Sequence, residues 1–382
     1  MQKATMGSAA SSTMDADVII EEWSNTNSAS IPVVSASTTV KSMPTNFSET
    51  LEECGHAKPV AKQKNLDYIW SDPIETVAKD LQSQLNFLNA QTDLNTTECA
   101  AASKFVAKST VFTTAENKDR RVGFVVIIAQ SDFVSFFLNA LTRHFRDDLL
   151  HDNNKSLFGV VRDLILVMWN GTDSSQMLCD KLAAQNGLET ILRSLNHDML
   201  QPQELENPKV IYITKGFLGI LHNCLQKLDC REKLRSKNAV NIISKFRASK
   251  NLMVKCKAEF DLSYLLNEKE NEQLNANAEN IKYMESILSA AMKHKSHYSK
   301  KYGYAAHEVI AALNRLASND GNKYKMADVG LLQHYVELLN PESANETEYV
   351  LAAKGLWILS FKLSEQITQE EGSITGLSHS LY

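Results

Sequence analysis

The sequence predicts an all-α protein that is built as an α–α superhelix of stacked helical units. Three observations predict this fold class. Apolar residues recur at helical spacing along most of the chain after residue 66, a triplet of one long and two short helices returns several times, and runs with strand periodicity are missing. Because no single helix can bury its apolar stripe alone, each unit needs a neighbour.

The clearest unit covers residues 157–195. Its first, long helix carries a wide apolar stripe, and we expect it to end at Gly171, which is followed by residue types that cap a second helix. The second helix is short. Asn186 tolerates a positive φ, so we expect the chain to turn there and to open a third, apolar helix at Gly187.

The residue that opens each third helix gives the period. Gly187 and Ala239 are 52 residues apart, Ala239 and Gly330 are 91 apart, and Gly330 and Gly372 are 42 apart. The interval of 91 is taken as two units, of which the one at residues 250–295 is degenerate. About six or seven units are therefore expected.

The chain divides into two parts. Residues 1–65 are rich in Ser and Thr and lack sustained apolar periodicity, which is typical of a disordered tail. Residues 66–382 hold the helical units. Within them, residues 122–128 are β-branched enough to form a buried strand, but we expect a helix because partner strands are missing elsewhere in the sequence.

Charge and cysteine content limit the cellular location and the partners that we expect for this protein. The net charge of −5 offers no global attraction to nucleic acid or to an anionic membrane. The six cysteines form no Cys-x-x-Cys pair, and most lie in apolar helical runs, which fits a reducing compartment. The N-terminus lacks a signal-peptide core, and no apolar run is long enough to span a bilayer. We expect a cytoplasmic protein with no membrane span and no nucleic-acid partner.

Three segments resemble armadillo repeats. They are Val167 to Asn170 with Asn186 to Glu189, Asp328 to Leu332, and Ala353 to Phe361, which show a long helix with a Leu-Trp-like run, a short polar helix and a Gly-led apolar helix. The likeness covers roughly residues 70–382 and implies an armadillo-like solenoid. The Trp357 segment is also similar to armadillo regions of signalling proteins that carry TIR or death domains.

The sequence departs from this family at one informative position. Importin- and catenin-type armadillo arrays, which this sequence otherwise resembles, carry an Asn four residues after the Trp of each long helix. In those arrays the Asn holds the backbone of an extended peptide. Asp173 and Phe361 stand at that spacing here. The resemblance therefore does not imply a peptide-backbone clamp or recognition of nuclear-localisation signals.

No pattern predicts a catalytic residue, a cofactor or a metal. Gly-rich phosphate loops are missing. His294 and His297 could offer two metal ligands, but a solvated basic turn is the favoured interpretation. His222, near Cys224, is interpreted as a satisfied core histidine rather than as half of a nucleophile pair. Trp169 and Trp357 are expected in the core.

Basic residues on neighbouring units are the candidate binding site. If the units stack in register, these residues could form a strip for an acidic partner, although a solvated inter-unit loop is the favoured interpretation of the run at residues 293–301. The candidate protein-binding residues are Arg231, Lys233, Arg235, Lys245, Arg247, Lys293, Lys295, Lys300 and Lys301.

The function that these observations favour is a non-enzymatic adaptor or scaffold. Such a protein would bind a protein or peptide on the concave face of the solenoid. If the basic strip makes the contact, the partner is expected to be acidic. One alternative is the regulatory armadillo region of a larger signalling protein of the TIR or death-domain type. Another is an enzyme with an unrecognised site, which would need convergent titratable groups with perturbed pKa values.

Overall fold

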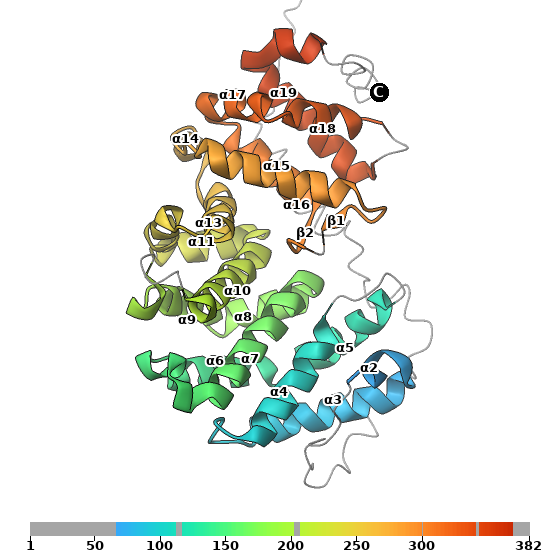
Figure 1. Cartoon of the computed structure of the whole chain (residues 1–382), viewed down its shortest axis with the longest axis vertical. Helices are drawn as coiled ribbons and strands as arrows, with labels where there is room; N and C mark the ends of the chain where they lie inside the picture. Colours follow the sequence, from blue (N-terminus) through green and yellow to red (C-terminus); the bar gives the residue numbers. More distant parts are fainter. Residues whose placement is uncertain (1–65, 112–116, 202–206, 300, 341–343, 370–382) are drawn as a thin grey trace, which may run out of the picture.

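The computed structural model describes residues 66–111, 117–201, 207–299, 301–340 and 344–369, and most of these residues are helical (Figure 1). The predicted all-α class is therefore confirmed, whereas the predicted disordered tail and the third helix expected at Gly372 lie outside the described residues. The α-helices are α2 Tyr68–Ser71, α3 Ile74–Asn89, α4 Thr97–Thr110, α5 Lys118–Gln130, α6 Phe133–His144, α7 Lys155–Ser174, α8 Gln176–Ala184, α9 Gly187–Leu195, α10 Pro208–Leu225, α11 Leu228–Ser236, α12 Ala239–Ser244, α13 Leu252–Leu265, α14 Glu268–Asn271, α15 Ala278–Met292, α16 Ala306–Leu316, α17 Asp320–Asp328, α18 Leu331–Glu337 and α19 Glu346–Gln369. The described residues also include four short 3-10 turns, namely η1 Asp147–Leu150, η2 Asp152–Asn154, η3 Asp198–Leu200 and η5 Lys245–Ala248.

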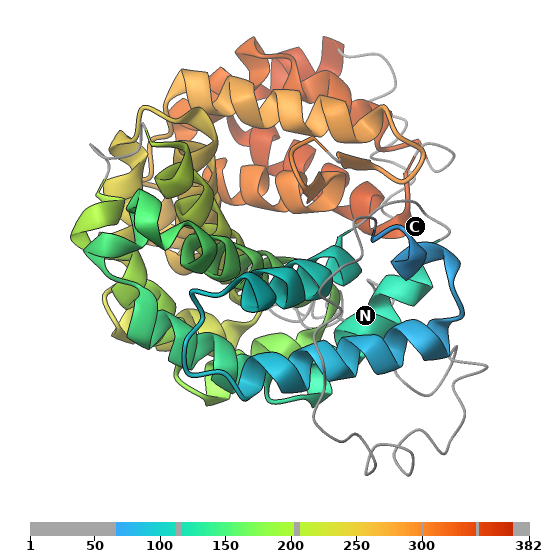
Figure 2. The same ribbon diagram turned by 60° about the horizontal axis from the view of Figure 1, so that its bottom comes forward.

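Every third helix belongs to one continuous row. α4 packs on α7, α7 on α10, α10 on α13, α13 on α16 and α16 on α19, and we call these six the inner helices. A second row runs beside them, in which α3 packs on α6, α6 on α9 and α9 on α12. Figure 1 shows the units following one another along the long axis, and Figure 2 shows that they also turn around that axis. Most of the apolar side chains of both rows are fully buried.

A left-handed residue separates the second and third helices of three units. Asn186, Asn238 and Gly330 have φ values of 57°, 63° and 84°, and they precede α9, α12 and α18. Short polar Asn and Gly tolerate this backbone region better than other residues do. These three positions correspond to one another in the three units. Gly187 and Ala239 are instead the first helical residues that follow them.

Gly171 does not end the long helix, contrary to the sequence prediction. α7 continues to Ser174, and Thr172 satisfies its hydroxyl by donating to the carbonyl of Met168 at 2.8 Å. Gly171 is buried, and a Cβ atom there would lie 2.6 Å from a methyl of Leu178. The glycine therefore makes room for α8 rather than breaking α7.

The structure confirms the helix at residues 122–128, which lies within α5, but it corrects the expectation that strands are missing. β1 (Tyr298–Ser299) and β2 (Tyr304–Ala305) form a two-residue antiparallel pair within the described chain. The turn between them uses Gly303 at φ 74°. The basic run predicted as a solvated loop thus contributes one arm of a small hairpin.

Trp357 lies outside the core, also contrary to prediction. Its side chain is 52% exposed, whereas many of the apolar side chains around it are buried. Trp169, the tryptophan at the corresponding place of α7, is half-buried and packs against the core. The two tryptophans differ because α10 covers α7, whereas no inner helix of the described chain comes after α19.

No single helix among the described residues has the length and apolarity needed to cross a membrane. One bent pair, α5 with α6, passes that test by length and composition when the two are taken together, with an angle of 69° between them.

Lysines on the short helices connect successive units. Lys181 donates to the carbonyl of Ser131, Lys233 to that of Ala183 and Lys325 to that of Ala276, and each pair is 49 or 50 residues apart. Ser131 and Ala183 lie at the ends of α5 and α8. A cation there is favourable because the last carbonyls of a helix lack intrahelical partners. The same bond therefore recurs with the repeat of the chain.

Gly219 permits the close contact between α7 and α10. A Cβ atom added there would lie 2.4 Å from the indole Nε1 of Trp169. We therefore expect Gly219→Ala to lower the free energy of unfolding in urea by about 1–3 kcal/mol, because the indole must leave its place.

Gly159→Ala is the matched control for this prediction. Gly159 lies inside α7 with nothing within 4 Å of an added Cβ, so the alanine should stabilise the protein by roughly 0.5–1 kcal/mol. Equal effects of the two substitutions would contradict the close helix contact.

Candidate functional site

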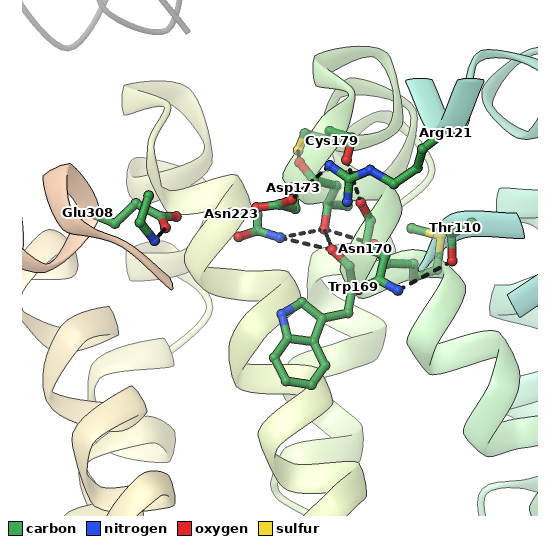
Figure 3. Close-up of polar contacts among 12 residues, drawn as sticks. Thr110, Arg121, Trp169, Asn170, Asp173, Cys179, Asn223 and Glu308 are labelled. Carbon is green, nitrogen blue, oxygen red and sulfur yellow. Dashed lines mark hydrogen bonds and ion pairs between the residues drawn. The ribbon is translucent and has the colours of Figure 1, made fainter. Parts of the chain in front are cut away.

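Asparagine side chains connect the C-terminal ends of the inner helices (Figure 3). The amide of Asn170 on α7 donates to the hydroxyl of Thr110 on α4 at 3.3 Å. The amide of Asn223 on α10 donates to the carbonyl of Trp169 at 3.1 Å and to the hydroxyl of Thr172 at 3.0 Å. These bonds hold the last turns of α4, α7 and α10 in register beside a group of charged residues.

We call this group the inner charge cluster, and it comes from five elements. α5 supplies one member, α7 one, α10 one, α13 two and α16 one. Its members are Arg121, Asp173, His222, Lys257, Asp261 and Glu308.

Asp173 is the most accessible member of the cluster. Its side chain is 34% exposed and lies 3.7 Å from the guanidinium of Arg121, which is 11% exposed. Desolvation nevertheless raises the pKa of Asp173, against the opposing effect of Arg121. The Asp173 carboxyl therefore reaches solvent on one side and is surrounded by protein on the others.

Lys257 connects three elements from a buried position. Its ammonium lies 4.5 Å from the ring centroids of both Trp169 and Tyr304, and it donates to the Tyr304 hydroxyl at 2.9 Å. Cation–π contacts of this kind strengthen when the ammonium is desolvated. Burial lowers the pKa of Lys257 to about 8. The side chain thus joins α7, α13 and β2.

His222 and Asp261 form a buried pair. The Nδ1 atom of His222 lies 3.5 Å from an Asp261 oxygen, and both side chains are at most 2% exposed. Burial, assisted by the charge of Lys257, lowers the pKa of His222 to about 3, so the imidazole is neutral. Burial also raises the pKa of Asp261 well above its ordinary value. The prediction of a core position for His222 is confirmed, although its Nδ1 atom and both Asp261 oxygens lack a hydrogen-bond partner within the described chain.

Glu308 lies in the first turn of α16, at the edge of the cluster. One of its oxygens accepts from the backbone N–H of Ala305 at 2.7 Å, and the other lies 3.9 Å from Nε2 of His222. Its side chain is 16% exposed. Burial, and next the charge of Asp173, raises the pKa of Glu308 to about 8. The charge of Asp173 therefore affects the pKa of Glu308, although the two residues are 135 positions apart in the sequence.

The accessible chemistry of the cluster is that of two carboxylates. Asp173 and Glu308 retain exposed surface, whereas Lys257 is 2% exposed. Two carboxylates with raised pKa values favour a cationic group, which would let both ionise. Among the described residues, no three His, Cys, Asp or Glu side chains are placed to hold a metal ion.

Several of the predicted binding residues already make hydrogen bonds or ion pairs within a unit or between units. The Nε atom of Arg231 donates to the carbonyl of Leu225 at 2.7 Å, and the side chain is 7% exposed. Lys233 bonds the carbonyl of Ala183 in the preceding unit. Arg235 pairs with Glu270 of the following unit at 2.7 Å. These contacts occupy donors that a partner would otherwise use.

Lys245 and Arg247 lie nearer to solvent. Lys245 is exposed and donates to the side chain of Asn196 at 2.7 Å. Arg247 donates to the carbonyl of Asn275 at 2.8 Å and lies 3.5 Å from Glu259. With Lys325, among others, Arg247 lines a cavity of about 650 Å³.

The remaining predicted residues lie around the hairpin. Lys293, Lys295 and Lys301 are exposed, and Lys300 lies outside the described residues. His297, within the same run, points instead to Glu348, with 2.7 Å between Nδ1 and Oε2. The eight described residues thus lie in two places, on α11 to η5 and around the hairpin, and their role in binding stays a prediction.

The inner charge cluster was not predicted from the sequence, although one signal was available. Lys257, Glu259 and Asp261 interrupt the apolar run of α13 at alternate positions, so charges fall on faces that an amphipathic helix would keep apolar. All three are buried. Arg121 gave no comparable signal, because it follows polar residues, and Asp173 was noted only as the residue four positions after Trp169.

Comparison with known proteins leaves the family open. No family model matches the sequence, and no curated protein is detectably similar to it. Among solved structures, the chain is similar to two crystal structures of engineered proteins from the Northeast Structural Genomics Consortium. The first shares 15% identity at a TM-score of 0.40 and covers 74% of this chain and 97% of its own. The second shares 14% identity at a TM-score of 0.35, and the match covers 82% of this chain and 76% of the engineered protein.

Glu308 should make stability depend on pH. The folded state keeps a proton up to about pH 8 that the unfolded chain releases near pH 4.5, so the free energy of unfolding falls as the pH rises between these values. Glu308→Gln retains the cap acceptor and removes this loss. At pH 9, we expect the variant to be more stable than the wild type by roughly 1–3 kcal/mol in urea unfolding, and near pH 4 equally stable.

Glu337→Gln is the control for this pH experiment, since Glu337 is exposed at the end of α18. It should shift the pH profile little. A Glu308→Gln profile that runs parallel to the wild type from pH 4 to 9 would show that the Glu308 carboxyl titrates normally.

Proposed function

We propose that the protein is a non-enzymatic adaptor with an armadillo-like architecture, and that it binds a partner protein on the face formed by the inner helices. The observation that carries the proposal is the convergence of accessible carboxylates from distant units, Asp173 of α7 and Glu308 of α16, at one place on that face. Curved arrays of stacked helices offer such faces to proteins and peptides.

The armadillo-like assignment is part of the same proposal. It is supported by the recurring triplets, by the unbroken row of inner helices and by the left-handed residue before α9, α12 and α18. The cytosolic location is supported by the five cysteines of the described chain, which are all free and buried.

The accessible groups favour a basic element in the partner. An Arg or Lys side chain placed between Asp173 and Glu308 would favour the ionised form of both carboxyl groups and would pair with them. Because Glu308 must lose its proton for this pairing, binding should strengthen as the pH rises from 7 to 9. The basic strip, with its acidic partner, stays a separate prediction.

A second candidate function is favoured by one observation. The inner charge cluster contains four groups with strongly perturbed pKa values, namely His222, Lys257, Asp261 and Glu308, and such groups are enriched at enzyme and ligand sites. The alternatives are therefore an enzyme or the ligand-sensing regulatory region of a signalling protein.

The test compares the full chain with its Asp173→Asn/Glu308→Gln double variant. Both are used to capture proteins from cytosolic extract, and captured proteins are quantified by mass spectrometry. We expect at least one protein to be enriched by the wild type and depleted about tenfold or more with the double variant, in line with loss of roughly 1.4 kcal/mol or more.

Asp328→Asn, which changes an exposed carboxylate at the end of α17, should leave capture unchanged. The captured protein is then produced and its affinity measured between pH 7 and 9. Equal capture by all variants would refute the proposed face. A metabolite that raises the melting temperature of the wild type but not of the double variant would instead favour the ligand-sensing alternative.

A further inference from the structure

The last described inner helix exposes a pair of aromatic side chains. Trp357 and Phe361 of α19 are 52% and 64% exposed, and their rings contact each other edge-on with centroids 5.3 Å apart. Tyr324 of the adjoining α17 is 49% exposed. We call Trp357 and Phe361 the α19 aromatic face. Single exposed apolar residues are ordinary, but neighbouring exposed aromatic residues are typical of protein contact sites.

The α19 aromatic face points away from the preceding inner helix. A Cβ atom on Gly355 would lie 2.5 Å from the side chain of Asn314 on α16, so Gly355 marks the side that α16 covers. Trp357 comes two positions later, which is about 200° around a helix. Its side chain is therefore on the side where a next inner helix would lie.

The α7–α10 contact shows how this row of helices covers such a tryptophan. Gly219 of α10 lies against the indole of Trp169, and Asn223, one turn later, donates to the Trp169 carbonyl and to the Thr172 hydroxyl. A glycine is needed because any Cβ would overlap the indole. The amide then satisfies acceptors of the last turn of α7.

α19 presents the same set of acceptors. Ser360 follows Trp357 by three positions, as Thr172 follows Trp169. The Ser360 hydroxyl donates to the Trp357 carbonyl at 2.7 Å. The Thr172 hydroxyl, which donates to the Met168 carbonyl at 2.8 Å, lies 3.1 Å from the Trp169 carbonyl. A tryptophan, its carbonyl and a hydroxyl are thus arranged alike on both helices, covered on α7 and exposed on α19.

We propose that the α19 aromatic face is a docking site for an amphipathic α-helix of a partner protein that carries Gly-x-x-x-Asn. The glycine lies against Trp357, and the asparagine donates to the Trp357 carbonyl and the Ser360 hydroxyl. The docked helix continues the row in which α10 covers α7 and α19 covers α16.

A second copy of this chain does not fit the site as well. Gly-x-x-x-Asn occurs once in the sequence, at Gly219 to Asn223. That segment is already packed on α7, and Gly219 is buried there. A second copy would have to release α10 from its own core in order to offer this motif.

The experiment uses the full chain and a fluorescein-labelled helical peptide of about 18 residues, long enough for five helical turns. The peptide keeps the α10 contact residues, including the glycine and the asparagine, and carries charged residues on its other face for solubility. We expect saturable binding in fluorescence anisotropy. Trp357→Ala in the chain and Gly→Val in the peptide should each weaken it by about tenfold or more, and Asn→Ala in the peptide by about threefold or more.

Met177→Ala, which removes another exposed apolar side chain at 43% exposure, should bind the peptide as the wild type does. Circular dichroism checks that each variant is folded, as expected for substitutions of exposed residues. Three results would overturn the proposal: equal affinity for the Gly→Val peptide, no binding at about 1 mM peptide, or self-association that Trp357→Ala abolishes, which would make a second copy the occupant.

Discussion

Each inner helix from α7 to α16 is covered on one side by its predecessor and on the other by its successor. The packing of α7 and α10 shows how close this contact becomes, because the indole of Trp169 lies where a side chain on Gly219 would be. Such close packing maximises dispersion contacts, but it cannot accommodate a larger side chain at the contact. The register of the whole row depends on this requirement, and so does the position of every polar group attached to it.

The helix ends impose a second requirement, since their last carbonyls need donors. This chain meets part of it across units. Lysines of the short helices reach back to the preceding unit, and Asn170 and Asn223 connect the ends of α4, α7 and α10. Basic residues such as Lys233, which a sequence pattern offers as contact points for a partner, therefore also serve to align the units.

Much of the fold could be predicted because it depends on local sequence patterns. The long apolar stripes and the Asn residues before α9 and α12 are local signals, and the structure has helices and left-handed turns there. Gly171 was misinterpreted because a glycine that ends a helix and one that admits a neighbour are alike in sequence. Trp357 was misplaced because exposure depends on a covering helix that the tryptophan itself does not encode.

The inner charge cluster could not be predicted for a similar reason. Asp173 and Glu308 become neighbours only through the turn that α10 and α13 impose between them, and no local pattern records the sum of those turns. The burial of Lys257 likewise results from Trp169 and Tyr304, which come from other units. The sequence did contain charge at unusual places in α13.

The bridge that Lys257 makes between α7 and β2 has a consequence for how this chain unfolds. An open string of stacked units, each touching only its two neighbours, can lose them one at a time from either end. Here Trp169 and Tyr304, 135 residues apart, share one ammonium, so the intervening helices are closed into a loop. Hydrogen exchange should accordingly report α7, α10, α13 and α16 as one cooperative block, with fraying confined to the flanking units.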